Sequence, residues 1–370
     1  MKSDLFTLFI QTNSPGELTS FVRPIVTIFK SLKPHSKIVI LLTPCQYATG
    51  NEMQIARTIK EVDQVLSPKQ TLKELYSLPV IKPHHGKGAV LFLGGGPLYS
   101  QLFGLKYKLP CYAYTEHKHK PGPFYKQVFY KHSHGDLMAE RVINYNPDIE
   151  NILTKYHLKN HRYCLFMGGS RKQHFNAFVP RLINIVKEIK TVKPDFKALL
   201  QVSPFVSDKT LDIFQNHYDL SDFIITRGEP LDIMGVSDLM VALPGTNNAE
   251  AMYMKLPMII LIPLNRPDLI ILDGVAGLIG RIPGLGTAFK RLILAIIKQK
   301  KTFHTLPNRL AQKQIVPEIA GVLSEHVVAQ TIMDYYYNKE KLSEIHDNLK
   351  NLPQTHDIAK HICETILSQP

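Results

Sequence analysis

Short apolar runs alternate with longer mixed segments along the chain, a pattern typical of buried parallel strands joined by helices. In the first part of the chain the pattern predicts strands at Leu5–Ile10, Lys37–Thr43, Ala89–Leu93 and Pro110–Tyr114, with helices at Leu18–Ser31 and Asn51–Lys60. After a polar stretch at Asn144–Asn160 it restarts, and strands are expected at Tyr163–Met167, Lys197–Val202, Phe223–Thr226, Leu239–Leu243 and Met258–Ile262. The chain is therefore predicted to be an α/β protein with two doubly wound, Rossmann-like domains.

We place the boundary between the two domains near residue 155. The N-terminal domain is expected over residues 1–155 and the second over 156–345, followed by a C-terminal helical segment over 346–370. The whole stretch from Ser324 to Gln369 has a helical pattern that is polar on one face.

Four transitions from a predicted strand to a loop are rich in Gly, Pro, Ser and Asn: Thr12–Glu17, Gly94–Pro97, Gly168–Arg171 and Pro244–Asn248. Open α/β sheets bind ligands beyond the carboxyl ends of their strands. Because one pair of transitions falls in each half, we expect an interdomain cleft that is lined from both sides.

The charge of the chain favours an anionic partner. Its 370 residues carry a formal net charge of +13, and 44% of them are hydrophobic. A nucleotide diphosphate, a phosphorylated lipid and an anionic membrane would each suit this excess. No aromatic-studded basic strand or recognition helix is present, so no nucleic-acid partner is expected.

Cysteine and histidine usage indicates a chain without a metal. The four cysteines are scattered and form no CxxC pair, which favours free thiols in a reducing compartment. The 16 histidines show neither HExxH nor a Cys/His spacing, so we expect no metal site. The apolar run at Leu5–Ile10 is too short for a signal segment, and no run approaches the roughly 20 residues of a membrane span. A cytoplasmic location is expected.

The segment Asp238–Met252 carries the most chemistry. A buried strand ends at Pro244, and Gly245, Thr246 and Asn247 then open a helix whose free N–H groups attract phosphate. Glu250 lies one turn further, where a carboxylate could accept hydrogen bonds from ribose hydroxyls. The alternative reading makes Thr246 an ordinary N-cap and Glu250 an exposed helix residue, and the spacing alone leaves both open.

Three further segments offer polar groups. Ser170 and Arg171 follow a glycine pair, and the fork of donors on Arg171 suits a diphosphate, although a solvated basic turn explains the same pattern. Gly16 permits close approach of a ligand, and Glu17 could act as a base or could simply stabilise a helix start. Asn308 and Arg309 lie in a Leu-Pro-Asn turn and could supply an amide and a guanidinium.

The region Leu261–Lys301 is apolar, rich in glycine and flanked by cations. We expect its last part to lie on an anionic membrane surface, through Phe289, Lys290, Arg291, Ile293 and Lys298. A core helix with a solvated basic end is the alternative. Together with the expected location, this predicts a peripheral protein on the inner face of the cytoplasmic membrane.

These segments together resemble the lipid-A-disaccharide synthase family of GT-B glycosyltransferases. The stretch Thr305–Glu318 is similar to the family's SLPN-L-A-G-x-x-x-V-P-E motif, and Pro244–Met252 is similar to SGTA-x-LEA-M. The loop Met167–Arg171 resembles PGSR, and Ser14–Glu17 resembles the ASGD turn. The matches occur in order across nearly the whole chain.

The resemblance implies a GT-B fold and a UDP-sugar co-substrate, with no cofactor. On that basis Gly16, Ser170, Arg171, Gly245–Asn247, Glu250, Asn308 and Arg309 would serve donor binding. The implied reaction is inverting: an N-acetylglucosamine-type sugar, acylated or not, moves from UDP to a lipid-linked, phosphorylated acceptor. A homodimer is left open.

The sequence departs from the family where the acceptor-side acid is expected. The family's DAPDFN-like segment is replaced by Gly94–Ser100, which contains no acid. Glu17 and Glu116 are then the candidate bases, ahead of His117. A diverged member is therefore expected. A UDP-sugar 2-epimerase and a non-catalytic relative that binds a nucleotide sugar or a phospholipid remain the alternatives.

Overall fold

The computed structural model describes residues 5–44, 50–77, 87–159, 161–169, 172–264, 303–353 and 357–368. The chain divides into two compact units, which are described one at a time. Unit 1 comprises Met1–Asn144 together with Gln354–Pro370, and unit 2 comprises Tyr145–Pro353. These boundaries differ from those expected from the sequence, at residues 155 and 345. The sequence also predicted a separate C-terminal segment over 346–370, whereas Gln354–Pro370 belongs to unit 1.

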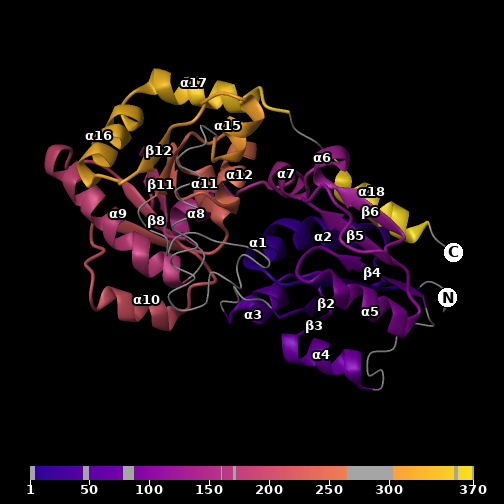
Figure 1. Cartoon of the computed structure of the whole chain (residues 1–370). Helices are drawn as coiled ribbons and strands as arrows, with labels where there is room; N and C mark the ends of the chain where they lie inside the picture. Colours follow the sequence, from indigo (N-terminus) through magenta and orange to yellow (C-terminus); the bar gives the residue numbers. More distant parts are fainter. Residues whose placement is uncertain are drawn as a thin grey trace. The chain divides into compact units, whose positions relative to one another are not determined.

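Unit 1 is built on a six-stranded parallel sheet with the strand order β3-β2-β1-β4-β5-β6 (Figure 1). Its strands are β1 (Thr7–Thr12), β2 (Lys37–Leu42), β3 (Gln64–Leu66), β4 (Gly88–Phe92), β5 (Cys111–Thr115) and β6 (Gln127–Tyr130). Every residue of β1, β4 and β5 is buried, as expected for parallel strands that are covered on both faces.

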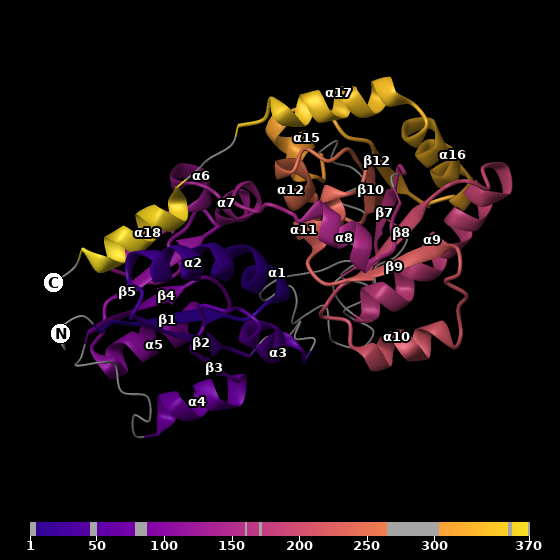
Figure 2. The ribbon, with the colours of Figure 1, turned by 180° about the vertical axis from the view of Figure 1, so that it is seen from behind.

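The helices of unit 1 cover both faces of this sheet. They are α1 (Pro15–Glu17), the π-helical η1 (Leu18–Val22), α2 (Arg23–Leu32), α3 (Glu52–Arg57), α4 (Pro68–Tyr76), α5 (Pro97–Tyr107), α6 (Lys131–His134), α7 (Leu137–Ile143) and α18 (Ile358–Leu367). Helices α2 and α18 lie on one face, and α4 and α5 lie on the other (Figures 1 and 2). The C-terminal helix α18 is fixed there because the backbone N–H of Ala359 donates to Glu140 Oε2 at 2.7 Å.

Unit 2 contains a second six-stranded parallel sheet, with the order β12-β11-β10-β7-β8-β9. Its strands are β7 (Cys164–Met167), β8 (Ala198–Val202), β9 (Phe223–Arg227), β10 (Leu239–Ala242), β11 (Met258–Pro263) and β12 (Glu318–Gly321). The prediction of two doubly wound α/β domains is therefore confirmed.

The main core of unit 2 lies between its sheet and two helices. The described helices are α8 (Ile149–Lys155), α9 (Lys172–Val192), α10 (Asp208–Gln215), α11 (Pro230–Gly235), α12 (Thr246–Tyr253), α15 (Leu306–Ala311), α16 (Glu325–Tyr336) and α17 (Lys339–Lys350). Helix α9 repeats apolar residues at helical spacing and packs them on β7 and β8, and α16 lies beside it (Figure 2). No helix in the described ranges is long and apolar enough to cross a membrane.

Every strand predicted from the sequence is present, within two residues at each end. The predicted helix at Leu18–Ser31 is η1 followed by α2, and the one at Asn51–Lys60 is the shorter α3. The strands β3, β6 and β12 were not predicted.

Candidate active site

The two sheets share one strand order when each is counted from its own first strand: third, second, first, fourth, fifth, sixth. In such a sheet the connections leave the first and fourth strands in opposite directions, and ligands bind beyond the carboxyl ends of these two neighbours. Those ends are the loops after β1 and β4 in unit 1 and after β7 and β10 in unit 2. The four loops are the glycine- and proline-rich segments that the sequence singled out.

In unit 1 the Glu17 carboxylate sits at the end of β1 and is held by its own turn. Its Oε2 accepts hydrogen bonds from the backbone N–H groups of Asn13 (3.0 Å) and Ser14 (3.2 Å) and from Thr12 Oγ1 (3.1 Å). Although Glu17 as a residue is only partly buried, burial of its carboxyl group raises its pKa, and the hydrogen bonds offset this only in part. A carboxylate with a raised pKa is a stronger base near neutral pH.

The glycine loop after β4 makes room for this carboxylate. A Cβ atom at Gly94 would lie 1.9 Å from Glu17 Cδ, so any side chain there would displace the carboxyl group. Gly95 has φ +88° and its Cβ would lie 2.7 Å from Thr43 Oγ1, so glycine is required for both conformation and space. The loop that lacks the family's acid therefore closes around Glu17.

Two buried polar atoms at this edge have no hydrogen-bond partner among the described residues: Gln11 Oε1 and Thr43 Oγ1. Gln11 Nε2 donates to the carbonyl oxygens of Gly94 (2.8 Å) and Gly96 (3.0 Å), which ties β1 to the glycine loop. Buried polar groups are normally satisfied, so these two atoms mark a place where a polar ligand group could bind.

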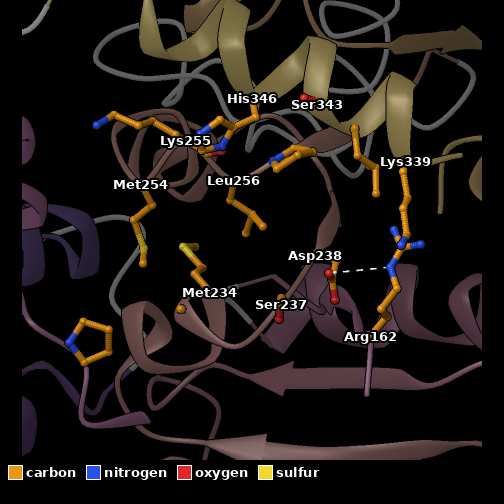
Figure 3. A pocket seen from close by; sticks show the side chains of 14 residues that line it. Arg162, Met234, Ser237, Asp238, Met254, Lys255, Leu256, Lys339, Ser343 and His346 are labelled. Carbon is orange, nitrogen blue, oxygen red and sulfur yellow. Dashed lines mark hydrogen bonds and ion pairs between the residues drawn. The ribbon is translucent and has the colours of Figure 1, made fainter. Parts of the chain in front are cut away.

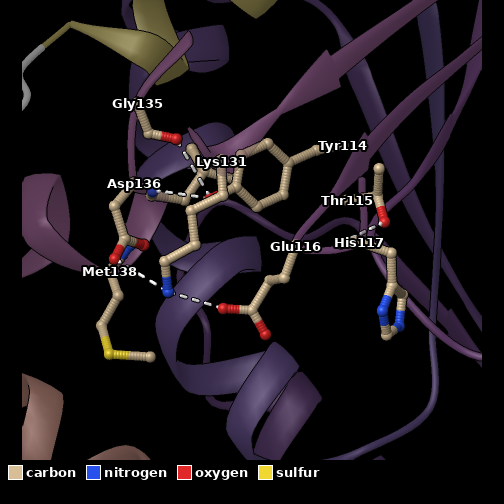
Figure 4. A network of polar contacts seen from close by, with 9 residues as sticks. Tyr114, Thr115, Glu116, His117, Lys131, Gly135, Asp136 and Met138 are labelled. Carbon is tan, nitrogen blue, oxygen red and sulfur yellow. Dashed lines mark hydrogen bonds and ion pairs between the residues drawn. The ribbon is translucent and has the colours of Figure 1, made fainter. Parts of the chain in front are cut away.

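Glu116, the second candidate base, follows β5 and is exposed to solvent. Figure 4 shows its carboxylate paired with Lys131, whose Nζ also contacts Asp136. The distances from Lys131 Nζ are 2.6 Å to Glu116 Oε1 and 3.0 Å to Asp136 Oδ2. Burial lowers the pKa of Lys131, but the two carboxylates outweigh it and raise that pKa, so Lys131 stays charged. Because Glu116 is exposed to solvent and ion-paired with Lys131, it is the weaker candidate for a base.

In unit 2 the loops after β7 and β10 bring small residues to the same edge. Gly168 and Gly169 follow β7, and Gly169 has φ +89°. Gly245 is the N-cap of α12, with extended φ of 169°, and a Cβ there would meet no atom within 4 Å. Gly245 is exposed, and Thr246 and Asn247 are partly exposed at the start of the helix. Ser170 and Arg171 lie outside the described residues.

Helix α12 turns two polar side chains inward. Glu250 is only 2% exposed, and it has interactions within the protein, so the alternative reading of Glu250 as an exposed helix residue is wrong. Asn248 is also 2% exposed, and its Oδ1 has no partner among the described residues. Whether Glu250 binds ribose stays a prediction. Asn248 was not identified from the sequence as a candidate site residue, although it belongs to the same Pro-Gly-Thr-Asn-Asn motif.

Asn308 is fully buried and is hydrogen-bonded within the protein at both ends of its amide. Its Nδ2 donates to Val316 O (2.9 Å) and Glu318 Oε1 (2.8 Å), and its Oδ1 accepts from the N–H groups of Ile315 (2.7 Å) and Val316 (2.9 Å). An amide has two donors and two acceptor sites, so this one is saturated. Arg309, the next residue, is exposed. A role of Asn308 in donor binding therefore stays a prediction and would have to act through the position of α15.

Glu318 completes this network at the other end of the motif. Its Oε1 accepts from Thr305 Oγ1 (2.7 Å) and from the N–H of Thr305 (2.9 Å), and its Oε2 accepts from the N–H of His304 (3.0 Å). Burial raises the pKa of Glu318, but these hydrogen bonds outweigh it and lower that pKa. The carboxylate thus accepts hydrogen bonds from the N–H groups of His304 and Thr305, which precede α15 and have no partner within that helix.

The residues expected at a membrane surface, Phe289, Lys290, Arg291, Ile293 and Lys298, lie outside the described residues. Gly16 lies within α1, and its carbonyl oxygen accepts a hydrogen bond from Thr19 Oγ1 at 3.2 Å. Among the residues that the structure describes, no group of three or more His, Cys, Asp and Glu side chains could hold a metal ion.

Comparisons with known proteins agree with this architecture. The family model of lipid-A-disaccharide synthetase matches residues 123–273. A lipid-A-disaccharide synthase from Alteromonas mediterranea is 25% identical over 231 residues, which cover 58% of this chain and 52% of that protein. One from Gloeothece citriformis is 24% identical over 177 residues, which cover 48% of this chain and 44% of that protein. The chain spans about half the length of the curated relatives it matches.

Among solved structures, a glycotransferase of kitacinnamycin matches 98% of this chain with a TM-score of 0.50 and 11% sequence identity, and 99% of that protein is covered. At this identity the likeness shows the fold, which is the two-domain GT-B arrangement of parallel sheets. The sequence matches and the fold agree, and they confirm the resemblance drawn from the motifs. The chain is similar in sequence to the lipid-A-disaccharide synthase family.

Proposed function

We propose that this protein is an inverting glycosyltransferase. It transfers an N-acetylglucosamine-type sugar, acylated or not, from UDP to a lipid-linked, phosphorylated acceptor, as in lipid A disaccharide synthesis. The observation that carries the proposal is the placement of the four glycine-rich loops at the carboxyl ends of the first and fourth strands of both sheets. The family relationship supports the choice of reaction.

In the proposed reaction the Glu17 carboxylate accepts the proton of an acceptor hydroxyl. The hydroxyl oxygen then forms a bond to the anomeric carbon of the donor sugar, while the bond from that carbon to the diphosphate oxygen breaks. UDP leaves with the electron pair of the broken bond. The backbone N–H groups at the start of α12, with Arg171, would stabilise the charge that develops on the diphosphate. No cofactor takes part, and the protein would act at the inner, anionic face of the cytoplasmic membrane.

Gly245 allows a direct test of the donor site. An Asp at this position should fold well, because Asp is a favourable N-cap residue, φ is extended and no atom lies within 4 Å of the added Cβ. Its charge would lie where we place the diphosphate. We expect Gly245→Asp to weaken UDP binding about tenfold or more relative to Gly245→Asn, which has the same shape without the charge.

The measurement is thermal stabilisation by UDP, with ADP for comparison, in the wild type and both variants. A ligand that binds only the native state raises the melting temperature according to its concentration and affinity. Equal UDP affinities of the Asp and Asn variants would show that the start of α12 does not bind the diphosphate. Turnover of the UDP-sugar without any acceptor would instead favour an epimerase.

A further inference from the structure

Unit 2 has a second polar site at the opposite edge of its sheet, formed by residues that precede the strands. A cavity of about 740 Å³ lies there (Figure 3). Arg162 comes just before β7, Asp238 just before β10 and Leu256 just before β11, while α17 supplies Lys339 and Leu342. Because all strands of the sheet are parallel, this amino-terminal edge lies at the other end of the strands from the loops of the proposed donor site.

Positive charge is in excess on one wall of the cavity. Arg162 Nε lies 3.6 Å from Asp238 Oδ1, and the other oxygen of Asp238 accepts a hydrogen bond from the N–H of Tyr163 at 2.8 Å. Lys339 forms no ion pair with any residue in the described ranges, and Figure 3 shows it reaching from α17 toward the Arg162 guanidinium. It is the first residue of α17, so the positive end of that helix dipole adds to the same wall. One carboxylate thus faces two cations and a helix start.

Much of the remaining lining of the cavity is apolar. It includes the side chains of Met234, Met254 and Leu256, Leu342 of α17, and Pro147 and Pro257. Figure 3 shows Met234, Met254 and Leu256 on the side of the cavity away from Arg162. Methionine side chains adapt to ligands of varied shape, so this wall suits a flexible alkyl group rather than one rigid ring.

We propose that this cavity binds an anionic amphiphile: a phosphate group held by Arg162 and Lys339, with an attached alkyl chain against the methionine and leucine wall. A planar guanidinium beside an ammonium group is well suited to a phosphate dianion. The site lies at the opposite edge of the sheet from the proposed donor loops, so its occupant is not the reacting acceptor. UDP and the amphiphile bind at the same time.

The test is calorimetric titration of the full chain with octyl phosphate below its micelle concentration. Inorganic phosphate and the uncharged octyl glucoside serve as comparison ligands. We expect octyl phosphate to bind at least about tenfold more tightly than inorganic phosphate, because burial of methylene groups adds to the charge interaction. Saturation with UDP should leave the affinity for octyl phosphate unchanged.

Lys339→Gln should weaken octyl phosphate binding about fivefold to tenfold and leave UDP binding as in the wild type. Lys350→Gln removes the same charge from the same helix, but Lys350 does not line the cavity, so this variant is the matched control. The proposal is overturned if both variants bind octyl phosphate equally or if UDP competes with it. Equal affinities for octyl phosphate and inorganic phosphate would overturn the amphiphile assignment. A failure of UDP binding alone would bear only on the proposed function.

Discussion

Replacing Glu17 by Gln should lower kcat by about 10²- to 10⁴-fold, the range typical for loss of a general base. The substitution keeps the size of the side chain and an oxygen that can accept the hydrogen bonds of Thr12, Asn13 and Ser14. UDP affinity should therefore stay at the wild-type level, and the loss should fall on the chemical step. Glu116→Gln, at an exposed carboxylate that is ion-paired with Lys131, is the control and should cost far less.

Stability should respond to Glu17→Gln in the opposite direction from activity. Because burial raises the pKa of Glu17, the folded state binds its proton more tightly than the unfolded state does. The wild type therefore loses stability as the pH rises from the ordinary Glu pKa through the raised value. The Gln variant cannot lose this contribution, so at neutral pH its free energy of unfolding should equal or exceed that of the wild type. Urea unfolding at several pH values measures this, and a variant that is less stable only at neutral pH would contradict it.

Gly94→Ala tests the position of the same carboxylate without changing its chemistry. The added Cβ would overlap Glu17 Cδ, and because that atom is near the end of a flexible side chain, the carboxyl group should move rather than the backbone. We expect kcat to fall by a large part of the Glu17→Gln effect, with wild-type UDP affinity. If Gly94→Ala retains wild-type kcat while Glu17→Gln does not, the position that the glycine loop gives to the carboxylate does not matter for catalysis.

The strands that were predicted from the sequence are those with the clearest hydrophobic pattern. Parallel strands in the middle of a sheet are buried on both faces and read as continuous apolar runs, as in Lys37–Leu42 and Met258–Pro263. The missed strands, β3, β6 and β12, are all at sheet edges. They are short and partly exposed, so their residues mix polar and apolar types and leave no run to recognise.

The sequence predicted which loops form the candidate site, but not which residues of those loops contact one another. Glycine and proline after an apolar run mark a strand end, and this was enough to find all four loops. The approach of Gly94 to Glu17 depends on β1 and β4 being neighbours, which no spacing in the sequence reveals. Likewise, the pattern of α18 shows an apolar face at Ile358, Ile362 and Ile366, but not that this face belongs to unit 1.

Asn308 shows how one motif can suggest two different roles. The resemblance to the family implied donor binding, whereas the structure gives its amide partners at Ile315, Val316 and Glu318. These partners join α15 to the segment before β12. If this structural role is the main one, substitutions at Asn308 should act on stability, and changes in UDP binding should follow only from loss of folded protein.

Asn308→Asp should lower the free energy of unfolding by about 3–5 kcal/mol at neutral pH, the range for a buried charge left without a compensating partner. The substitution replaces the Nδ2 group that donates to Glu318 Oε1 at 2.8 Å with a second carboxylate oxygen, so two negative charges face each other. In the wild type the pKa of Glu318 is lowered, so its contribution to stability is present above the ordinary Glu pKa and is lost as the pH falls through the lowered value. The deficit of the variant should therefore shrink on acidification, because a proton on either carboxyl group relieves the repulsion. Asn151→Asp, an exposed position on α8, makes the same charge change and should stay within about 0.5 kcal/mol of the wild type. A variant of unchanged stability with weakened UDP binding would instead show that Asn308 supports donor binding through the position of α15.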